Sequence, residues 1–244
     1  EKEGRPVGLL DLDVHFGTGA LALDLEPGRG LTDAIENPSR IDGLFIERAM
    51  VKATEKLAVL SAEAPINSPI ITDGSAFYQL QEEIRAAFEM TIIDLPRPML
   101  VQYPHLITDV QVAIVATELT LAAARDTIRL LSWLKSNAPQ TKVYVVANKV
   151  HPGSTLEISR KDFEGTIERS IDYQIVFDQK LAAQAAKLGK TFVEAGKGSK
   201  TIAPIGELAV KLAGAATEDA AAAANGKPQS LLERLGLGAK KPGT

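Results

Sequence analysis

Cysteine is absent from the 244 residues of this chain. The absence excludes disulfides, cysteine-ligated iron–sulfur clusters and thiolate metal sites, and it is consistent with a cytoplasmic protein. Basic residues are in deficit as well, since 27 Lys and Arg stand against 31 Asp and Glu. Because nucleic-acid binding uses a basic face, this balance argues against a nucleic-acid partner. No apolar run approaches the roughly 18 residues of a membrane-spanning helix, so we expect no membrane span.

The chain is 45% apolar, which is enough for one α/β domain with a real core. Short apolar runs alternate with stretches whose apolar residues recur at helical spacing. The expected strands are Val7–Leu10, Leu57–Leu60, Met90–Ile93, Val112–Val115, Val143–Val146 and a weaker run, Ile175–Phe177. The expected helices are Ser75–Phe88, Ala122–Leu134, Arg160–Ile171, Gln179–Leu188 and Pro204–Ala213. The alternation predicts an α/β fold with a doubly wound, mostly parallel sheet flanked by helices.

The composition changes after Gly214, which divides the chain into a domain over residues 1–214 and a segment over residues 215–244. The segment begins with an Ala-rich stretch that Gly226 and Pro228 interrupt, and we expect a flexible Ala/Gly linker there. The tail that follows holds four leucines and three cations between residues 231 and 241. It predicts a short amphipathic helix that makes weak contact with a membrane or docks on a partner. The alternative is a tail that is disordered or packed back on the domain.

Polar side chains follow several expected strands at the point where each strand ends. The first run ends in Asp11 and Asp13, which share a face because side chains alternate along a strand; later runs end in Asp94 and Asn148. Ligands of doubly wound sheets bind at these ends, so we expect the four side chains to converge on one sheet edge. Carboxylates at such an edge handle a cation or a phosphate, since charge is expensive inside a protein. The alternative is that each Asp caps the next helix or is solvated.

Two of these residue types suit a nucleotide site in particular. An apolar strand that ends in a single Asp, such as Asp94, has the form of a Walker B motif, whose carboxylate holds Mg²⁺ through water. The amide of Asn148 both donates and accepts hydrogen bonds, as recognition of a base requires. The three histidines, in contrast, share no metal-ligand spacing and indicate no metal site.

Taken together and in this order, these features resemble the MinD/ParA family of deviant-Walker ATPases, and within it the pilus-assembly branch called CpaE or TadZ. The resemblance covers residues 1–214 and implies a P-loop NTPase-like fold. Its motifs are the long switch segment over residues 11–52, the Walker B motif and second switch at Ile92–Pro98, the stretch ending in Arg-Asp at Thr117–Asp126, the strand with a base-contacting Asn at Val145–Val150, and the loop near the adenine at Ile175–Lys180.

The resemblance also implies roles for single residues. Asp11 is similar to the first-switch Asp near Mg²⁺ and Asp13 to the carboxylate that positions the attacking water, so both are catalytic candidates. Asp94 resembles the Walker B Asp, which holds Mg²⁺ through water. The implied cofactor-binding residues are Asn148 at the adenine, Asp178 close by, Pro96 at the start of the second switch, and Arg125 near the nucleotide or the dimer face. For Arg125 a solvated helix charge is an equally open alternative.

The chain departs from the family pattern at the phosphate-binding loop. The deviant Walker A sequence, Lys-Gly-Gly-x-Gly-Lys-Thr in form, belongs upstream of Gly4 and is found nowhere in the chain. Gly189-Lys190-Thr191 ends in the right letters, but it follows an expected helix rather than a strand. We therefore expect the natural protein to continue upstream with the family's first strand and P-loop. Because that strand lies mid-sheet in the family, its neighbours are expected here to expose apolar faces and unpaired backbone.

The resemblance implies a localisation or assembly factor of a type IV (Flp/Tad) pilus or secretion system that works as an ATP-dependent dimer switch. ATP and Mg²⁺ are the cofactors expected for the intact protein, whereas this chain, without the loop, is expected not to bind ATP; whether it catalyses hydrolysis is left open. The expected partners are pilus or secretion assembly proteins and a second copy, in the cytoplasm with recruitment to the inner membrane or cell pole. The alternative is a non-hydrolysing scaffold that keeps the fold for protein binding.

Overall fold

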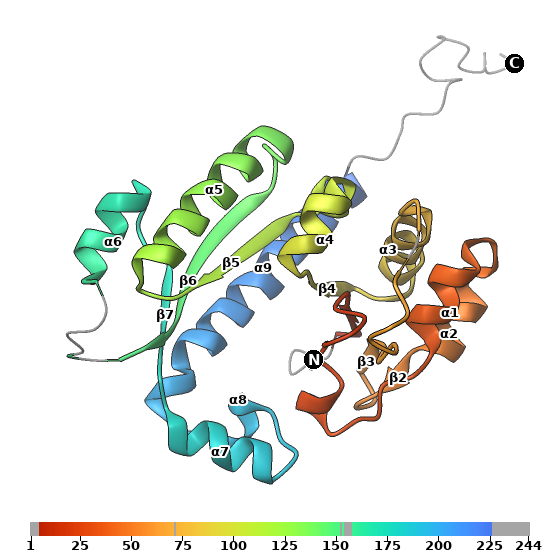
Figure 1. Cartoon of the computed structure of the whole chain (residues 1–244), viewed down its shortest axis with the longest axis horizontal. Helices are drawn as coiled ribbons and strands as arrows, with labels where there is room; N and C mark the ends of the chain where they lie inside the picture. The colour runs from red at the N-terminus through yellow and green to blue at the C-terminus, as the bar shows by residue number, and fades with distance from the viewer. Residues whose placement is uncertain (1–4, 71, 152, 154–157, 226–244) are drawn as a thin grey trace, which may run out of the picture. The chain divides into compact units, whose positions relative to one another are not determined.

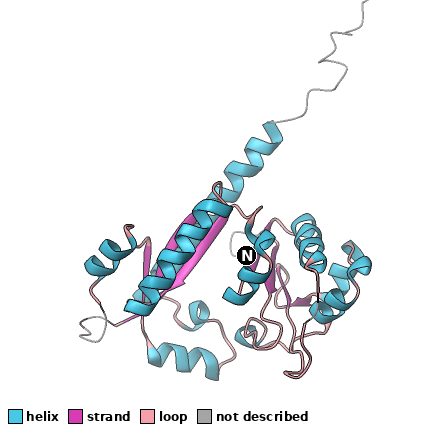
Figure 2. Cartoon of the chain, turned by 45° about the horizontal axis from the view of Figure 1, so that its top comes forward, coloured by secondary structure: helices cyan, strands magenta, loops and turns pink. Residues whose placement is uncertain are grey.

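The described strands form two β-sheets, and helices lie beside each of them (Figures 1 and 2). The structure, a computed structural model, describes residues 5–70, 72–151, 153 and 158–225, and of residues 215–225 only the backbone. Within these residues the strand orders are β2-β3-β1-β4 and β5-β6-β7. The strands are β1 (Val7–Asp11), β2 (Val51–Lys52), β3 (Leu57–Leu60), β4 (Met90–Asp94), β5 (Val112–Thr117), β6 (Lys142–Val150) and β7 (Tyr173–Val176).

Helices connect the strands, most of which run parallel. β1 pairs in parallel with β3 and β4, and β6 does so with β5 and β7, whereas the short β2 is antiparallel to β3. The α-helices are α1 (Gly30–Glu36), α2 (Gly43–Ala49), α3 (Ser75–Ala87), α4 (Arg97–Gln102), α5 (Leu121–Asn137), α6 (Arg160–Ile167), α7 (Gln179–Lys187), α8 (Phe192–Ala195) and α9 (Ala203–Asn225). The short 3-10 helices are η1 (Leu21–Leu23), η2 (Pro38–Arg40), η3 (Pro104–Ile107) and η4 (Lys200–Ile202). The predicted α/β class with mostly parallel strands is confirmed.

The apolar faces of the helices pack on the sheets. In α3, Phe77 and Ile84 are fully buried against Leu10 of β1. On the second sheet, Val145 of β6 packs against Phe163 of α6, and α5 lies beside β5 (Figure 1). Burial of this kind explains why the strands have continuous apolar runs rather than an alternation of polar and apolar residues.

Each sheet has two edge strands with no further partner in the described part of the chain. β4 is an edge strand of the first sheet and β5 is an edge strand of the second, and the other two edges are β2 and β7. Leu95, just after β4, packs against apolar clusters of both sheets. Ile92 of β4 is 47% exposed and Ile114 of β5 is 46% exposed. The sequence predicted one sheet, and the described strands form two because no described strand pairs with these edges.

Helix α9 continues through the Ala-rich stretch to Asn225, where the sequence predicted a flexible linker. Alanine has the highest helix propensity, which accounts for the difference. Contacts divide the chain into one unit, Glu1–Leu208, and a second unit from Ala209 onward. The predicted docking leucines of the tail lie outside the described residues. Of the helices that the structure describes, none combines the length and the hydropathy needed to cross a membrane.

Candidate functional site

Asp11 ends β1, and its side chain is fully buried. One carboxylate oxygen, Oδ1, accepts the backbone N–H of Asp13 at 3.0 Å, and the other, Oδ2, accepts that of Gly19 at 2.9 Å. Each oxygen thus has a donor, which compensates a buried carboxylate for the loss of water. The predicted role of Asp11 near Mg²⁺ stays a prediction, but in this conformation the carboxylate binds its own loop.

The loop after β1 returns over the Asp11 carboxylate, and two glycines allow the approach. A Cβ atom added at Gly17 would lie 2.6 Å from Oδ2 of Asp11, and one added at Gly19 would lie 2.9 Å from the same oxygen. Both distances are too short for a real side chain, so glycine is required at each position. Sequence reasoning assigned these glycines no function. The sequence signal for this loop was a pair of glycines separated by a single residue, shortly after a strand that ends in an acid.

Asp13 lies on this loop and is half-buried. Its Oδ1 accepts the backbone N–H of Phe16 at 3.1 Å, which closes the first turn of the loop. The carbonyl of Val14 accepts the N–H of Ala64 at 2.9 Å, which ties the loop to the segment after β3. The position of the Asp13 carboxylate is therefore set by loop contacts on both sides.

Asp94 ends β4 and stands beside Asp11 in the parallel register of β1 and β4. Its side chain is exposed. Desolvation at the strand end raises the pKa of Asp94 above its ordinary value, and the negative charges of Asp11 and then Asp13 raise that pKa further. The structure thus brings together the three acids that the sequence predicted to converge.

A divalent cation suits this group, because it would offset both the desolvation of Asp94 and the repulsion from Asp11 and Asp13, which together raise the pKa of Asp94. Asp94 and Asp13 are accessible to such a cation, whereas Asp11 is buried under its loop. The described residues contain no cluster of three His, Cys, Asp or Glu already arranged to hold a metal ion. The acids therefore fit Mg²⁺ as part of a larger site and do not form a complete metal site by themselves.

Pro96 and Arg125 lie on the segments that follow β4 and β5. Pro96 precedes α4, and its carbonyl accepts the N–H of Met99 at 3.0 Å. The next residue, Arg97, forms an ion pair with Asp126 of α5, which connects the two segments. Arg125 is exposed on α5, and no hydrogen bond or ion pair in the described part of the chain joins it to the three acids.

Asn148 lies inside β6 rather than after it, because the strand continues to Val150. The pairing with β7 changes register between Ala147 and Val150, and Lys149 has a φ of 52°, so the strand bulges at Asn148. The Asn148 Oδ1 accepts the N–H of Lys149 at 2.9 Å. Among the residues that the structure describes, no hydrogen bond joins Asn148 to the three acids, and its convergence with them stays a prediction.

Asp178 is the N-cap of α7, and its Oδ1 accepts the N–H of Leu181 at 2.9 Å. Its observed contact is therefore a helix cap, and its place near an adenine stays a prediction. At the other end of α7, Gly189 has a φ of 56° and closes the helix. Gly189-Lys190-Thr191 is thus a helix end rather than a phosphate-binding loop after a strand. None of the loops that the structure describes is a phosphate-binding loop between a strand and a helix N-terminus.

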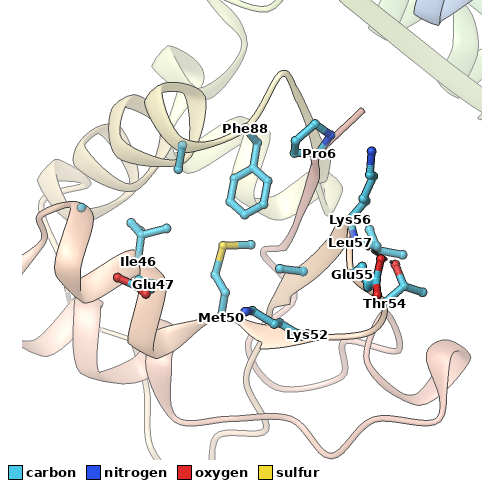
Figure 3. Close-up of a pocket in the computed structure, with 13 residues that line it drawn as sticks. Pro6, Ile46, Glu47, Met50, Lys52, Thr54, Glu55, Lys56, Leu57 and Phe88 are labelled. Atoms are coloured by element: carbon cyan, nitrogen blue, oxygen red, sulfur yellow. Dashed lines mark hydrogen bonds between the residues drawn. The ribbon is translucent and has the colours of Figure 1, made fainter. Parts of the chain in front are cut away.

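A pocket of about 200 Å³ lies elsewhere, at the starts of β1 and β3 rather than at their ends (Figure 3). Ile46, Met50 and Phe88 form its apolar wall, and Pro6 and Leu57 lie at the strand starts. Because parallel strands start and end on opposite edges of a sheet, this pocket is separate from the acids. It is apolar where the candidate site is acidic.

Many solved structures match the fold of this chain, and three of them are a ParA family ATPase and two MinD proteins. A ParA family ATPase from Chlorobium tepidum has a TM-score of 0.75 at 16% sequence identity, over 85% of each chain. MinD from Aquifex aeolicus has a TM-score of 0.68 at 20% identity, over 87% of this chain and 86% of that one. MinD from Pyrococcus horikoshii, complexed with Mg-ADP, has a TM-score of 0.63 at 18% identity, over 88% and 87%. No family model and no curated protein matches the sequence. The chain has the fold of the MinD/ParA family ATPases.

Proposed function

We propose that this chain is the switch-bearing part of a MinD/ParA-like ATPase. The observation that carries the proposal is that Asp11 and Asp94 lie at the tips of two paired strands with Asp13 nearby on the loop after β1, in a fold shared with ParA and MinD structures. Asp94 would hold Mg²⁺ through water, and a bound Mg²⁺ would supply charge neutralisation at the phosphates. Asp13 orients the attacking water.

The proposed nucleotide site needs a phosphate-binding segment that the 244 residues do not contain. We place this segment between β4 and β5. The support is that neither strand has a partner at this edge in the described residues, and that Ile92 and Ile114 are half-exposed there. One parallel apolar strand would pair with both edges, and the helix after it would cover the two isoleucines. The loop between that strand and its helix would then lie at the same sheet edge as Asp94, because parallel strands end on one side.

The remaining residues of the proposed site contact the base and the partner subunit. Asn148 contacts the adenine, with Asp178 and Pro96 beside the nucleotide and Arg125 at the nucleotide or dimer face. In this proposal ATP promotes a homodimer and hydrolysis reverses it. The acidic balance of the chain supports a protein partner rather than nucleic acid.

For the biological role we propose localisation or assembly of a type IV (Flp/Tad) pilus or secretion system. The support is the resemblance of residues 11–52 to the switch segment of the CpaE/TadZ branch. The protein acts in the cytoplasm and is recruited to the inner membrane or cell pole by pilus or secretion proteins, with weak membrane contact through residues 229–244.

A second candidate function is a non-hydrolysing scaffold. Two observations favour it: the chain lacks a Walker A loop, and the Asp11 carboxylate is occupied by its own loop. A scaffold would keep the fold for protein binding and would have no need of the acids as ligands. The two candidates differ in what the loss of Asp94 does.

Hydrolysis tests the switch. In the chain joined to a Walker A strand, loop and helix, Asp94→Ala is expected to lower Mg²⁺-dependent ATP hydrolysis by roughly 100-fold or more, because charge stabilisation by the cation is lost. Asp109→Ala, which removes an exposed acid after η3, is the matched control and keeps full turnover. Unchanged turnover in Asp94→Ala removes Asp94 from the mechanism.

Complementation separates the switch from the scaffold. A strain without the gene for this protein is expected to lose pili, and the Asp94→Ala variant, expressed at the wild-type level, is expected not to restore them. Full restoration by Asp94→Ala supports the scaffold. Pili that persist in the deletion strain contradict the pilus role itself.

A further inference from the structure

The Asp11 carboxylate makes the contacts of a loop anchor. Both of its hydrogen bonds go to backbone N–H groups of the loop that follows it, at Asp13 and Gly19, and no part of its side chain reaches solvent. Hydrogen bonds with a charged acceptor are the stronger kind. A carboxylate that closes a loop from beneath in this way fixes the path of the chain between its two donors.

The loop is fitted to this carboxylate at atomic distance. At Gly19 the three atoms nearest an added Cβ all belong to Asp11, with Oδ2 at 2.9 Å and the Asp11 Cβ at 3.4 Å. Gly28, in the same connection between β1 and α1, has no atom closer than 3.5 Å to an added Cβ. Crowding by the Asp11 carboxylate is therefore found at Gly17 and Gly19 and not at Gly28.

The anchored segment includes Asp13. The carbonyl of Asp13 accepts the N–H of Gly17 at 2.8 Å, and its carboxylate accepts the N–H of Phe16 at 3.1 Å. The Asp13 carboxylate thus belongs to the Asp13–Gly19 segment, whose first and last N–H groups both donate to Asp11. Moving the loop from Asp11 moves Asp13 with it.

We propose that Asp11 is a positioning residue, whose buried carboxylate holds the Asp13–Gly19 loop and thereby places Asp13, rather than a ligand of Mg²⁺. The contrast with Asp94 supports the assignment, because Asp94 is exposed on the neighbouring strand. A cation reaches Asp11 only if the loop opens. The inference rests on the proposed function for the role of Asp13, and its first two tests need no nucleotide.

A double-mutant cycle between Asp11 and Gly19 tests the fit. Gly19→Ala is expected to lower the Tm of the chain by about 3 °C or more, since its Cβ meets the carboxylate. In the Asp11→Ala background the same substitution is expected to lower the Tm by less than about half as much, because the crowding atom is gone. Gly28→Ala is the control and changes the Tm little in either background. An equal effect of Gly19→Ala in both backgrounds overturns the proposal.

Amide hydrogen exchange, followed by NMR, tests the hydrogen bonds. Asp11→Asn is expected to speed exchange of the Gly19 or Asp13 amide by roughly tenfold or more, because an amide side chain has one acceptor oxygen instead of two. Asp94→Asn, which removes a charge at the next strand tip, leaves both amides protected. Fast exchange of the Gly19 amide in the wild-type chain contradicts an anchored loop.

The Mg²⁺ dependence of hydrolysis, in the chain joined to a Walker A segment, separates positioning from ligation. Asp11→Asn is expected to lower kcat by roughly tenfold or more with the half-saturating Mg²⁺ concentration unchanged within about twofold, as for a residue that acts through Asp13. A rise of tenfold or more in that concentration identifies Asp11 as a ligand and overturns the proposal. If the wild-type protein has no hydrolysis, the proposed function fails, and the stability cycle and the exchange measurement still decide the role of Asp11 in placing the loop.

Discussion

The acids at the tips of β1 and β4 are neighbours with different surroundings. Asp11 is buried and has a donor on each oxygen, whereas Asp94 is exposed and faces the charges of Asp11 and Asp13. The raised pKa of Asp94 means that the folded protein binds this proton more tightly than the unfolded chain does. The contribution of Asp94 to stability therefore falls as the pH rises from the ordinary pKa of an Asp through the raised pKa of Asp94.

Asp94→Asn is expected to remove this decline, because the amide carries no charge at any pH. The variant is expected to be more stable than the wild type at pH 7, with a difference that shrinks as the pH falls below the ordinary pKa of an Asp. Thermal melts of both proteins between about pH 3.5 and 8 measure the difference. Asp109→Asn, on an exposed acid, is the control. A variant that is less stable than the wild type at pH 7 would contradict an ionised Asp94 that is destabilised by desolvation and by the charges of Asp11 and Asp13.

At this scale the sequence predicted which acids meet but not what each one contacts. The ends of apolar runs were enough to place Asp11, Asp13 and Asp94 together, because parallel strands end on one side of a sheet. The burial of Asp11 depends on the return of the loop to Gly19, which is a tertiary contact. Asp178 was predicted to lie near the adenine, and its observed contact is a helix cap.

Among the elements, β4 and β5 expose apolar side chains at edges that lack a partner in the described part of the chain. Ile92→Lys and Ile114→Lys are expected to reduce self-association of this chain, since a charge on an edge strand blocks pairing between copies. The change in unfolding free energy is expected to stay under about 1.5 kcal/mol because both side chains are half-exposed. Sedimentation velocity and thermal melts measure the two effects.

Val101→Lys provides the control for these two variants. Val101 is 82% exposed but lies on α4 rather than on a strand edge. Its substitution is expected to leave self-association unchanged, because a helix offers no unpaired strand groups. Equal effects of all three substitutions would mean that general surface hydrophobicity, and not the strand edges, drives association.

Element type followed from the pattern of apolar residues more reliably than element ends did. β3 has the predicted bounds, because the run Leu57–Leu60 is apolar throughout. β6 extends beyond its predicted end to Val150 through Asn148 and Lys149, polar residues that a strand accepts at a bulge. α9 passes through an Ala-rich stretch that low complexity made resemble a linker. The ends of these elements depend on strand pairing and helix packing, which the spacing of apolar residues does not reveal.

For the whole molecule, the pattern of strands and helices predicted a fold that is shared with proteins of low sequence identity. ParA and MinD structures share the fold at 16% to 20% identity. Strand order was not readable from the runs, and neither was the division into two sheets, since both depend on which edges find partners. The edges of β4 and β5, which pair with no strand in the described residues, and the missing Walker A sequence both support the proposal of a phosphate-binding segment between β4 and β5.

Mg-ATP binding, measured by calorimetry, tests this account most directly. The chain of 244 residues is compared with the same chain joined to a Walker A strand, loop and helix. Because the acids at the strand tips repel phosphates and the chain has no phosphate loop, we expect a Kd weaker than roughly 1 mM for the chain alone. We expect a Kd in the micromolar range for the joined protein, since backbone N–H groups of the loop then hold the phosphates. Micromolar affinity of the chain alone would contradict the account.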